Sequence, residues 1–364
     1  MPFLALCIIG PTKTGRDDPK GEIGRRGTGT VRYAGTARGE EVLMGLQEAG
    51  ADWGWSEDVA ATPLADGLWL LDLGFQGRRG VVAAYLLAGE GELALIETGP
   101  ATTLPTLEAG VRAAGFALSD LTHVLLTHIH LDHAGAAGVL ARENPKLVIR
   151  VHPIGAPHLV DPSRLLASAT RIYGDKMDSL WGEVAPIAAE QVLPLEDDEV
   201  LSVAGRRLRV AFTPGHASHH IAYFDEATAG VFTGDVGGIR MQGTSYVCPP
   251  VPPPDLDPDA WRTSIARLRA FSAKRLYLTH FGPYDDVDAH LDRLLAELGV
   301  LLLIGEEMVA PAPDRVDQGV LTERIHQRMA EQLGPVPDDL LINLEWATPS
   351  YMAALGLIRL FRKR

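Results

Sequence analysis

One short segment of the chain carries three histidines and an aspartate within six residues: His128, His130, Asp132 and His133. A short apolar run, residues 124–127, comes directly before it and predicts a buried strand. Imidazole nitrogens and carboxylate oxygens are the usual ligands of zinc and of other first-row metals. Four such groups packed at one strand end would repel one another or lack partners without a cation. The segment therefore predicts a metal site.

Four groups in six residues cannot all bind one ion, because neighbouring side chains diverge in a loop. His128 and His130 can point the same way along an extended segment. Asp132 and His133 can then turn toward a second ion as the following helix begins. The spacing predicts two metals, which require further ligands elsewhere in the chain.

Three later segments repeat this setting, in which a short apolar strand ends beside a histidine or an aspartate. The three residues are His216, Asp235 and His280. Separate strands of one sheet that end at the same edge would bring these side chains together, as in many enzymes with loop-borne ligands. We therefore expect one shared site.

Apolar runs separated by glycine-bearing turns predict strands on either side of a helical insertion over residues 156–190. The predicted strands are 68–73, 81–87, 92–97, 124–127, 147–151, 199–203, 207–212, 221–224, 230–233 and 275–279. The predicted helices are 104–114, 134–142, 259–271, 289–303, 319–332 and 338–362. Residues 13–39 show no sustained hydrophobic period of 2 or 3.6 residues, so we expect residues 1–60 to be a poorly ordered or loosely docked extension.

Composition excludes several classes of protein. With 33 Lys and Arg against 47 Asp and Glu, the net charge of −14 argues against a broad basic face for nucleic acids. No apolar run reaches the roughly 18–20 residues of a membrane span, and no export signal is recognisable. Two cysteines cannot form a disulfide framework. We expect a cytoplasmic protein that binds neither nucleic acid nor membrane.

The motifs His-x-His-x-Asp-His, Gly-His, Thr-Gly-Asp and Thr-His, in this order, resemble the metallo-β-lactamase superfamily over about residues 64–290. The resemblance implies an α/β fold, a four-layer αβ/βα sandwich, as a catalytic domain over 61–300 with a C-terminal helical region over 301–364. The implied ligands are His128, His130 and His216 for the first metal, Asp132, His133 and His280 for the second, and Asp235 as the bridge. Glu97 stands where the family usually has Asp.

Two cations that share a water would lower its pKa from about 15.7 toward about 7 and supply hydroxide at neutral pH. We expect Asp132 to orient this nucleophile and to accept its proton. The chain is thus predicted to be a dinuclear metal-dependent hydrolase. Two divalent ions are expected, zinc first, with iron or manganese as alternatives.

The substrate is less constrained, because superfamily members cleave many kinds of bond. Glyoxalase II-like proteins, and uncharacterised members with a C-terminal helical extension, are the nearest neighbours by resemblance. We expect a small ester-like substrate, a thioester or lactone. An iron-dependent persulfide dioxygenase-like oxidoreductase, a phosphodiesterase or nuclease, and a non-catalytic metal-binding module are the alternatives.

The helical insertion and the loop over residues 237–255 each follow a ligand-bearing segment, so we expect both to flank the metals. Candidate substrate contacts there are Tyr173, Trp181, Arg240 and Tyr246. Arg240 could bind a substrate carboxylate or lie on the surface. The C-terminal helices must bury their apolar faces, either over the cleft or in a homodimer interface.

Overall fold

The computed structural model describes residues 61–363, which belong to one compact unit. The extension expected over residues 1–60 lies outside the described residues. The first group of strands is β1 (Thr62–Ala65), β2 (Leu68–Asp72), β3 (Ala83–Gly89), β4 (Glu92–Ile96), β5 (His123–Leu125), β6 (Val148–Val151) and β7 (Val192–Pro194). The second group is β8 (Val200–Val203), β9 (Arg206–Phe212), β10 (Ile221–Asp225), β11 (Gly230–Phe232), β12 (Arg275–Leu278) and β13 (Gly282–Tyr284).

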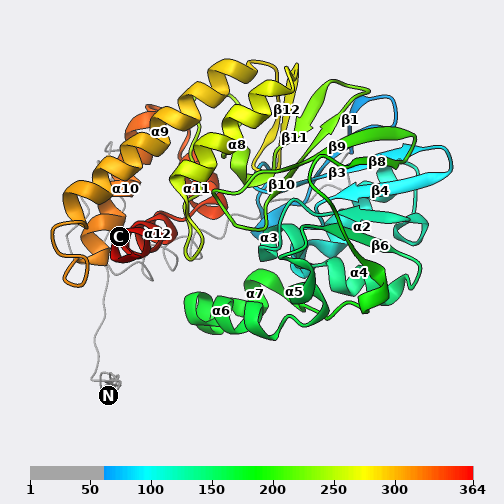
Figure 1. The fold of residues 1–364 in the computed structure, drawn as a ribbon, viewed down its shortest axis with the longest axis horizontal. Helices are drawn as coiled ribbons and strands as arrows, with labels where there is room; N and C mark the ends of the chain where they lie inside the picture. Colours follow the sequence, from blue (N-terminus) through cyan, green and yellow to red (C-terminus); the bar gives the residue numbers. More distant parts are fainter. Residues whose placement is uncertain (1–60, 364) are drawn as a thin grey trace, which may run out of the picture. The chain divides into compact units, whose positions relative to one another are not determined.

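Each group forms one sheet, and helices cover the outer sides of both sheets (Figure 1). The first sheet has the order β1-β2-β3-β4-β5-β6-β7, and the second has the order β13-β12-β11-β10-β9-β8. The helices are α2 (Leu104–Ala113), α3 (Leu131–Ala134), α4 (Ala137–Glu143), α5 (Ala156–Val160), α6 (Ser163–Tyr173), α7 (Met177–Trp181), α8 (Pro258–Ala270), α9 (Val287–Met308), α10 (Gln318–Leu333), α11 (Asp338–Ala347) and α12 (Ser350–Lys363). None of these helices is both long enough and apolar enough to cross a bilayer.

The strands are apolar on both faces because each sheet is covered on both sides. In β3, Tyr85 and Leu87 point into the core between the sheets, whereas Leu86 points into the core under α2 and α4. On the other side, Leu276 and Leu278 of β12 pack beneath α8 and α9. Three buried cores therefore separate four layers, which confirms the predicted αβ/βα sandwich.

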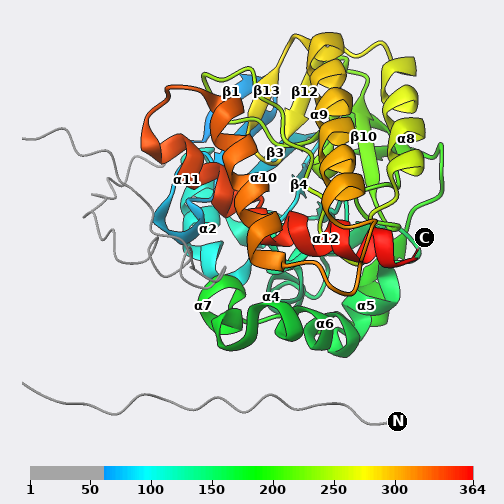
Figure 2. The same ribbon diagram turned by 90° about the vertical axis from the view of Figure 1, so that its left-hand side faces the viewer.

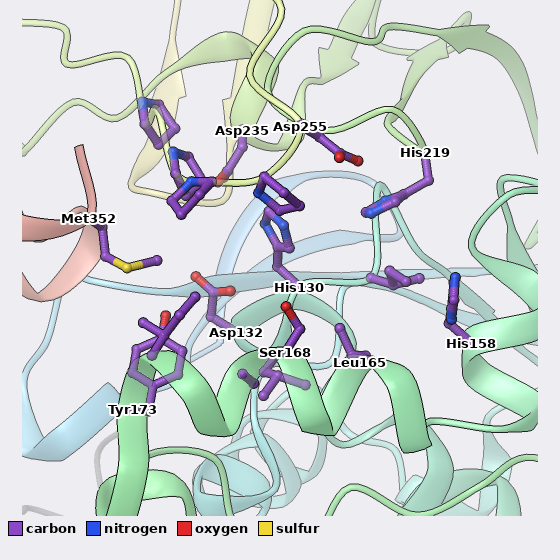
Figure 3. Close-up of a pocket in the computed structure, with 18 of the residues that line it drawn as sticks. His130, Asp132, His158, Leu165, Ser168, Tyr173, His219, Asp235, Asp255 and Met352 are labelled. Carbon is purple, nitrogen blue, oxygen red and sulfur yellow. The ribbon is translucent and has the colours of Figure 1, made fainter. Parts of the chain in front are cut away.

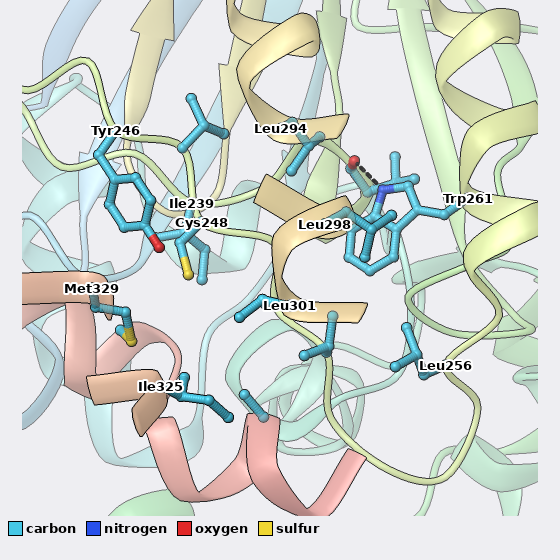
Figure 4. Close-up of a cluster of buried hydrophobic side chains, with 14 of the residues drawn as sticks. Ile239, Tyr246, Cys248, Leu256, Trp261, Leu294, Leu298, Leu301, Ile325 and Met329 are labelled. Atoms are coloured by element: carbon cyan, nitrogen blue, oxygen red, sulfur yellow. Dashed lines mark hydrogen bonds between the residues drawn. The ribbon is translucent and has the colours of Figure 1, made fainter. Parts of the chain in front are cut away.

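The C-terminal helices share a core with the second sheet. Leu298 and Leu301 of α9 and Ile325 of α10 belong to the same buried cluster as Leu276 of β12 (Figure 4). Figure 2 shows α12 lying against α9 and α10. The boundary expected between residues 300 and 301 falls inside α9, so the helical region continues the sandwich without a break.

The helix predicted over residues 338–362 is two helices, α11 and α12, with Thr348 and Pro349 between them. Thr348 is extended, with φ −146° and ψ 88°. A residue that precedes proline avoids the helical region because the proline ring clashes with its backbone. The break is therefore a property of Pro349, and it turns α12 toward the sandwich.

Two helical glycines test how closely α12 approaches the loop before α8. A Cβ on Gly356 of α12 would lie 1.8 Å from the carbonyl oxygen of Val251, whereas a Cβ on Gly299 of α9 would have no neighbour within 4 Å. Gly356→Ala should therefore lower the free energy of unfolding by about 1–3 kcal/mol through overpacking. Gly299→Ala should raise it by roughly 0.5–1 kcal/mol through helix propensity. Urea unfolding measures both, and equal stabilities of the two variants would contradict the packing described.

Candidate metal centre

All seven predicted ligand residues lie at one edge of the sandwich, to which both sheets contribute. β4 and β5 are parallel neighbours in the first sheet, and β11 and β12 are parallel neighbours in the second. β9 runs in the same direction as β11 because each is antiparallel to β10. The loops after these strands therefore leave the sandwich at one edge. They carry His128, His130, Asp132 and His133 after β5, His216 after β9, Asp235 after β11 and His280 after β12.

A first group consists of His128, His130, His216 and Asp235, whose candidate ligand atoms all lie within 4.8 Å of one another. Nδ1 of His130 lies 3.0 Å from Nε2 of His128 and 2.9 Å from Nε2 of His216. Nε2 of His216 lies 3.3 Å from Oδ2 of Asp235. The four side chains thus point at one small volume.

A second group consists of Asp132, His133 and His280. Nε2 of His280 lies 3.3 Å from Nε2 of His133 and 3.5 Å from Oδ2 of Asp132. The other oxygen of Asp235, Oδ1, lies 3.2 Å from Nε2 of His133 and 3.4 Å from Nε2 of His280. The two oxygens of Asp235 therefore face the two groups.

Hydrogen bonds on the outer side of the rings fix how these histidines point. Nδ1 of His280 lies 2.6 Å from the carbonyl oxygen of Val81, and Nδ1 of His216 lies 2.9 Å from that of Pro250. A carbonyl oxygen only accepts, so each Nδ1 carries the proton and Nε2 presents its lone pair to the centre.

Glu97, which the sequence marks as a departure from the family pattern, is completely buried beside the centre. Its carboxylate accepts a hydrogen bond of 2.5 Å from Oγ1 of Thr127 and lies 3.2 Å from Nδ1 of His133. Thr127 Oγ1 is in turn 3.0 Å from Nδ1 of His128. Glu97 therefore orients one imidazole of each group, and it also belongs to a third set of candidate ligands with His128 and His133.

The charges at this edge favour a bound cation. Burial and the neighbouring His216 lower the pKa of His130 to about 4, so its imidazole is neutral at pH 7. Burial alone would lower the pKa of His133, but Asp235 and Asp132 outweigh it and raise that pKa. Asp235 Oδ1 is buried and accepts no hydrogen bond from any described residue. The raised pKa of His133 means that the carboxylates favour a positive charge beside it. A divalent ion would supply that charge in place of the proton, and Asp235 Oδ1 offers it a buried oxygen.

Comparison with known proteins places this arrangement in a family. The sequence profile of the metallo-beta-lactamase superfamily matches residues 77–280, which include all seven side chains. The chain belongs to the metallo-beta-lactamase superfamily. The predicted resemblance is thereby confirmed at the level of the superfamily, and the closer likeness to glyoxalase II stays a prediction.

Individual members of the superfamily resemble the chain at lower identity. A metallo-beta-lactamase fold-containing protein of Sulfurisphaera tokodaii, ST1585, is 26% identical over 223 residues, which make up 60% of this chain and 80% of that protein. The crystal structure of a metallo-beta-lactamase family protein from Thermus thermophilus, TTHA1429, superimposes with a TM-score of 0.62 at 25% identity and covers 83% of this chain and 95% of that one. An atrochrysone carboxyl ACP thioesterase of Cryptosporiopsis sp., dmxR1, is 26% identical over 49% of this chain, which spans 42% of that enzyme.

A pocket of about 370 Å³ opens over the centre (Figure 3). His130, Asp132 and Asp235 reach its surface. Tyr173 and Trp181, predicted as substrate contacts, also line it. Their rings meet edge to face with centroids 5.0 Å apart, and Trp181 stacks on Phe75 at 5.6 Å.

Arg240 and Tyr246 do not line this pocket, which corrects their prediction as substrate contacts. Arg240 lies 4.0 Å over the ring of Tyr284 and forms an ion pair of 2.7 Å with Asp286. Tyr246 is buried in the C-terminal core, where its hydroxyl donates to Glu297 at 3.2 Å. Packing therefore directs both side chains away from the metal centre.

Several pocket residues were not predicted as contacts. They are His158 and Arg164 of the helical insertion, His219 and Asp255 of the second half, and four residues beyond the family match, Ala347, Thr348, Pro349 and Met352. We name residues 347–352 the roof segment. The sequence indicated this segment only through the apolar face of the last predicted helix, which had to be buried. That face was compatible either with a position over the cleft or with a dimer interface.

A buried carboxylate fixes the roof segment. Glu345 of α11 accepts a hydrogen bond of 2.9 Å from the backbone N–H of Ser350, and the hydroxyl of Ser350 donates to it as well. The oxygen that accepts from the Ser350 hydroxyl, Oε1, also lies 2.7 Å from Nδ1 of His326 in α10. Glu345 thus ties the first turn of α12 to α10.

The pKa of His326 is raised by its hydrogen bond to Glu345, which gives this contact a pH dependence. A raised folded-state pKa means that the stabilisation is complete below the unfolded value of about 6.5 and is lost as pH rises through the folded value. The difference in unfolding free energy between wild type and His326→Gln should therefore be larger at pH 5.5 than at pH 9. A difference that is constant with pH, measured by urea unfolding, would show that protonated His326 does not stabilise the fold.

Proposed function

We propose that the chain is a dinuclear metal-dependent hydrolase of small ester-like substrates, with thioesters first and lactones second. The observation that carries this proposal is Asp235. One of its oxygens faces His216, and the other faces His133 and His280. This is the arrangement that a bridging ligand between two ions needs. The pocket above it gives a substrate access to both groups.

His128, His130 and His216 would hold one ion, and Asp132, His133 and His280 the other. Imidazole and carboxylate donors without thiolate suit zinc, with iron and manganese as alternatives. Bound there, two divalent ions would lower the pKa of a shared water to about 7 and polarise a carbonyl.

The chain's own residues orient the water and manage its proton. The side chain of Asp132 is 21% exposed, the most exposed carboxylate of the centre, and it lines the pocket. Burial opposes its ionisation, but His133 and His280 outweigh burial and lower its pKa to about 2, so the carboxylate is ionised at neutral pH and can orient a water by accepting its hydrogen bond. In hydrolysis the water oxygen bonds to the carbonyl carbon, the C–S or C–O bond breaks, and the leaving group departs with a proton. Asp132 is placed to relay that proton.

A thioester is favoured over other bonds by two observations. The described part of the pocket is lined mainly by apolar side chains, which suits an acyl group better than a phosphodiester. The relative from Cryptosporiopsis carries the name of a thioesterase. An iron-dependent oxidoreductase of the same fold is the second candidate, because a centre of histidines and carboxylates also suits iron.

A hydrolysis panel on metal-analysed protein tests the proposal. Thioesters, lactones, phosphodiesters and β-lactams are compared for wild type, His130→Ala and the control His123→Ala, a partly exposed histidine of β5. His130→Ala should lower kcat/KM more than about 100-fold, because losing a ligand exceeds the cost of losing a ligand's hydrogen-bond partner. His123→Ala should retain activity. Wild-type turnover by His130→Ala on every substrate would refute the proposal, and iron with oxygen uptake on a persulfide would favour the oxidoreductase.

Glu97→Gln tests whether Glu97, which orients imidazoles of the centre, contributes to metal binding. The amide keeps the size of the side chain, but it removes the charge that faces His133 and replaces an oxygen that Thr127 contacts. Metal affinity, measured by competition with a chelator, should fall about 10- to 100-fold. Glu143→Gln, on an exposed position of α4, is the matched control and should leave the affinity unchanged. Equal affinities of the two variants would contradict the role assigned to Glu97.

A further inference from the structure

The pocket extends to both sides of the metal centre along helix α6. Figure 3 shows Tyr173 and Met352 on one side of Asp132, and His158 and His219 on the other. Residues 165 and 173 of α6 both line the pocket, and eight residues of helix span about 12 Å. A substrate whose reacting carbonyl lies at Asp132 therefore sends its two halves in opposite directions along α6.

The two sides differ in polarity. We name the first the apolar arm, lined by Ile172, Tyr173, Trp181, Pro349 and Met352. We name the second the polar arm, where Figure 3 shows His158, His219 and Asp255 beside the apolar Leu165. Among the described residues, no charged side chain lines the apolar arm, whereas the carboxylate of Asp255 in the polar arm accepts a hydrogen bond of 2.7 Å from the hydroxyl of Ser218.

The side chains that line the apolar arm are held in place by the core behind them. Trp181 and Met352 are 6% and 9% exposed, so their positions are fixed by the surrounding core. Tyr173 is half-buried, and Figure 3 shows its side chain directed from α6 toward Asp132. From that position the hydroxyl can donate a hydrogen bond to a carbonyl oxygen whose chain continues along the apolar arm.

We infer that the substrate is a thioester or ester of a hydrophobic acyl group, with the acyl chain in the apolar arm and a polar leaving group in the polar arm. This inference rests on the proposed hydrolase function and adds the direction in which the substrate binds. Negative charge develops on the leaving sulfur or oxygen as its bond to carbon breaks. Moving that charge into surroundings without polar partners is costly, whereas a hydrocarbon chain gains from them.

Two isomeric thioesters separate this orientation from simple hydrophobicity. S-ethyl thiohexanoate and S-hexyl thioacetate are isomers. The first carries its longer alkyl chain, a pentyl group, on the carbonyl carbon, and the second carries its longer chain, a hexyl group, on sulfur. The full-length wild-type protein should hydrolyse S-ethyl thiohexanoate at least about tenfold faster in kcat/KM. Along a series of S-ethyl thioesters, kcat/KM should also rise from acetyl to hexanoyl, by on the order of threefold for each methylene buried.

A charge placed in the arm supplies the matched variants. Ile172→Asp introduces a carboxylate at a half-buried position of the apolar arm, and Thr170→Asp introduces the same charge at an exposed position of the same helix. Ile172→Asp should abolish the preference for the hexanoyl thioester while S-ethyl thioacetate is still hydrolysed. Thr170→Asp should behave as wild type. Equal rates on the two isomers in wild type, or equal chain-length profiles in the two variants, would overturn the inference.

Binding of the product acid keeps the test independent of turnover. Hexanoate, but not acetate, should raise the Tm of wild type and of Thr170→Asp, and should leave that of Ile172→Asp unchanged, because only a ligand of the folded state stabilises it. If neither a thioester of any length nor a lactone is cleaved, the proposed function fails while the hexanoate result still decides the arm. If S-ethyl thioacetate is cleaved but hexanoate shifts no Tm and the isomers react equally, the arm fails and the hydrolase stands.

Discussion

The meeting of buried carboxylates with imidazoles at one edge is the constraint on which the rest of the structure depends. Asp235 and Glu97 are held almost without solvent, which is costly unless opposite charge lies close. His133 lies within 3.2 Å of both carboxylates. The strands must therefore end at the same level in both sheets, because the histidines that face these carboxylates come from loops of each sheet. A shift of one sheet relative to the other would separate these carboxylates from the histidines and leave their charges unpaired.

The sequence was enough to predict that the candidate ligands lie together, because each of them follows a strand within a few residues. Direction along a strand and position at its end are local properties, so His216, Asp235 and His280 could be placed before any contact was known. The three strands that the sequence analysis missed, β1, β7 and β13, lie at sheet edges and contain Pro63, Pro194 and Pro283. Proline is tolerated in edge strands, and it interrupts the alternation of apolar and polar residues by which a strand is predicted.

Side-chain direction in the loops was beyond local reasoning. Arg240 and Tyr246 follow Asp235 closely in sequence, yet Arg240 turns to Asp286 and Tyr246 to Glu297, partners that lie 46 and 51 residues later. Tyr173 and Trp181 were placed correctly in the pocket because the insertion carrying them is helical and packs directly beside the centre. The position of the roof segment depends on the helix break at Pro349, which can be recognised in the sequence. It also depends on the hydrogen bonds to Glu345, which cannot.

Because α9 shares a core with the second sheet, substitutions in different parts of the C-terminal region should have different effects on the pocket and on the metal centre. The roof segment stands on a core that also supports β11 and β12, the strands that deliver Asp235 and His280. Substitutions inside that core would disturb the chemistry and the pocket together. Residues of α6 and of the roof segment face the cavity without holding any ligand, so they can vary alone. New substrate ranges should therefore arise by changes at these few positions, with the helical region retained as a whole.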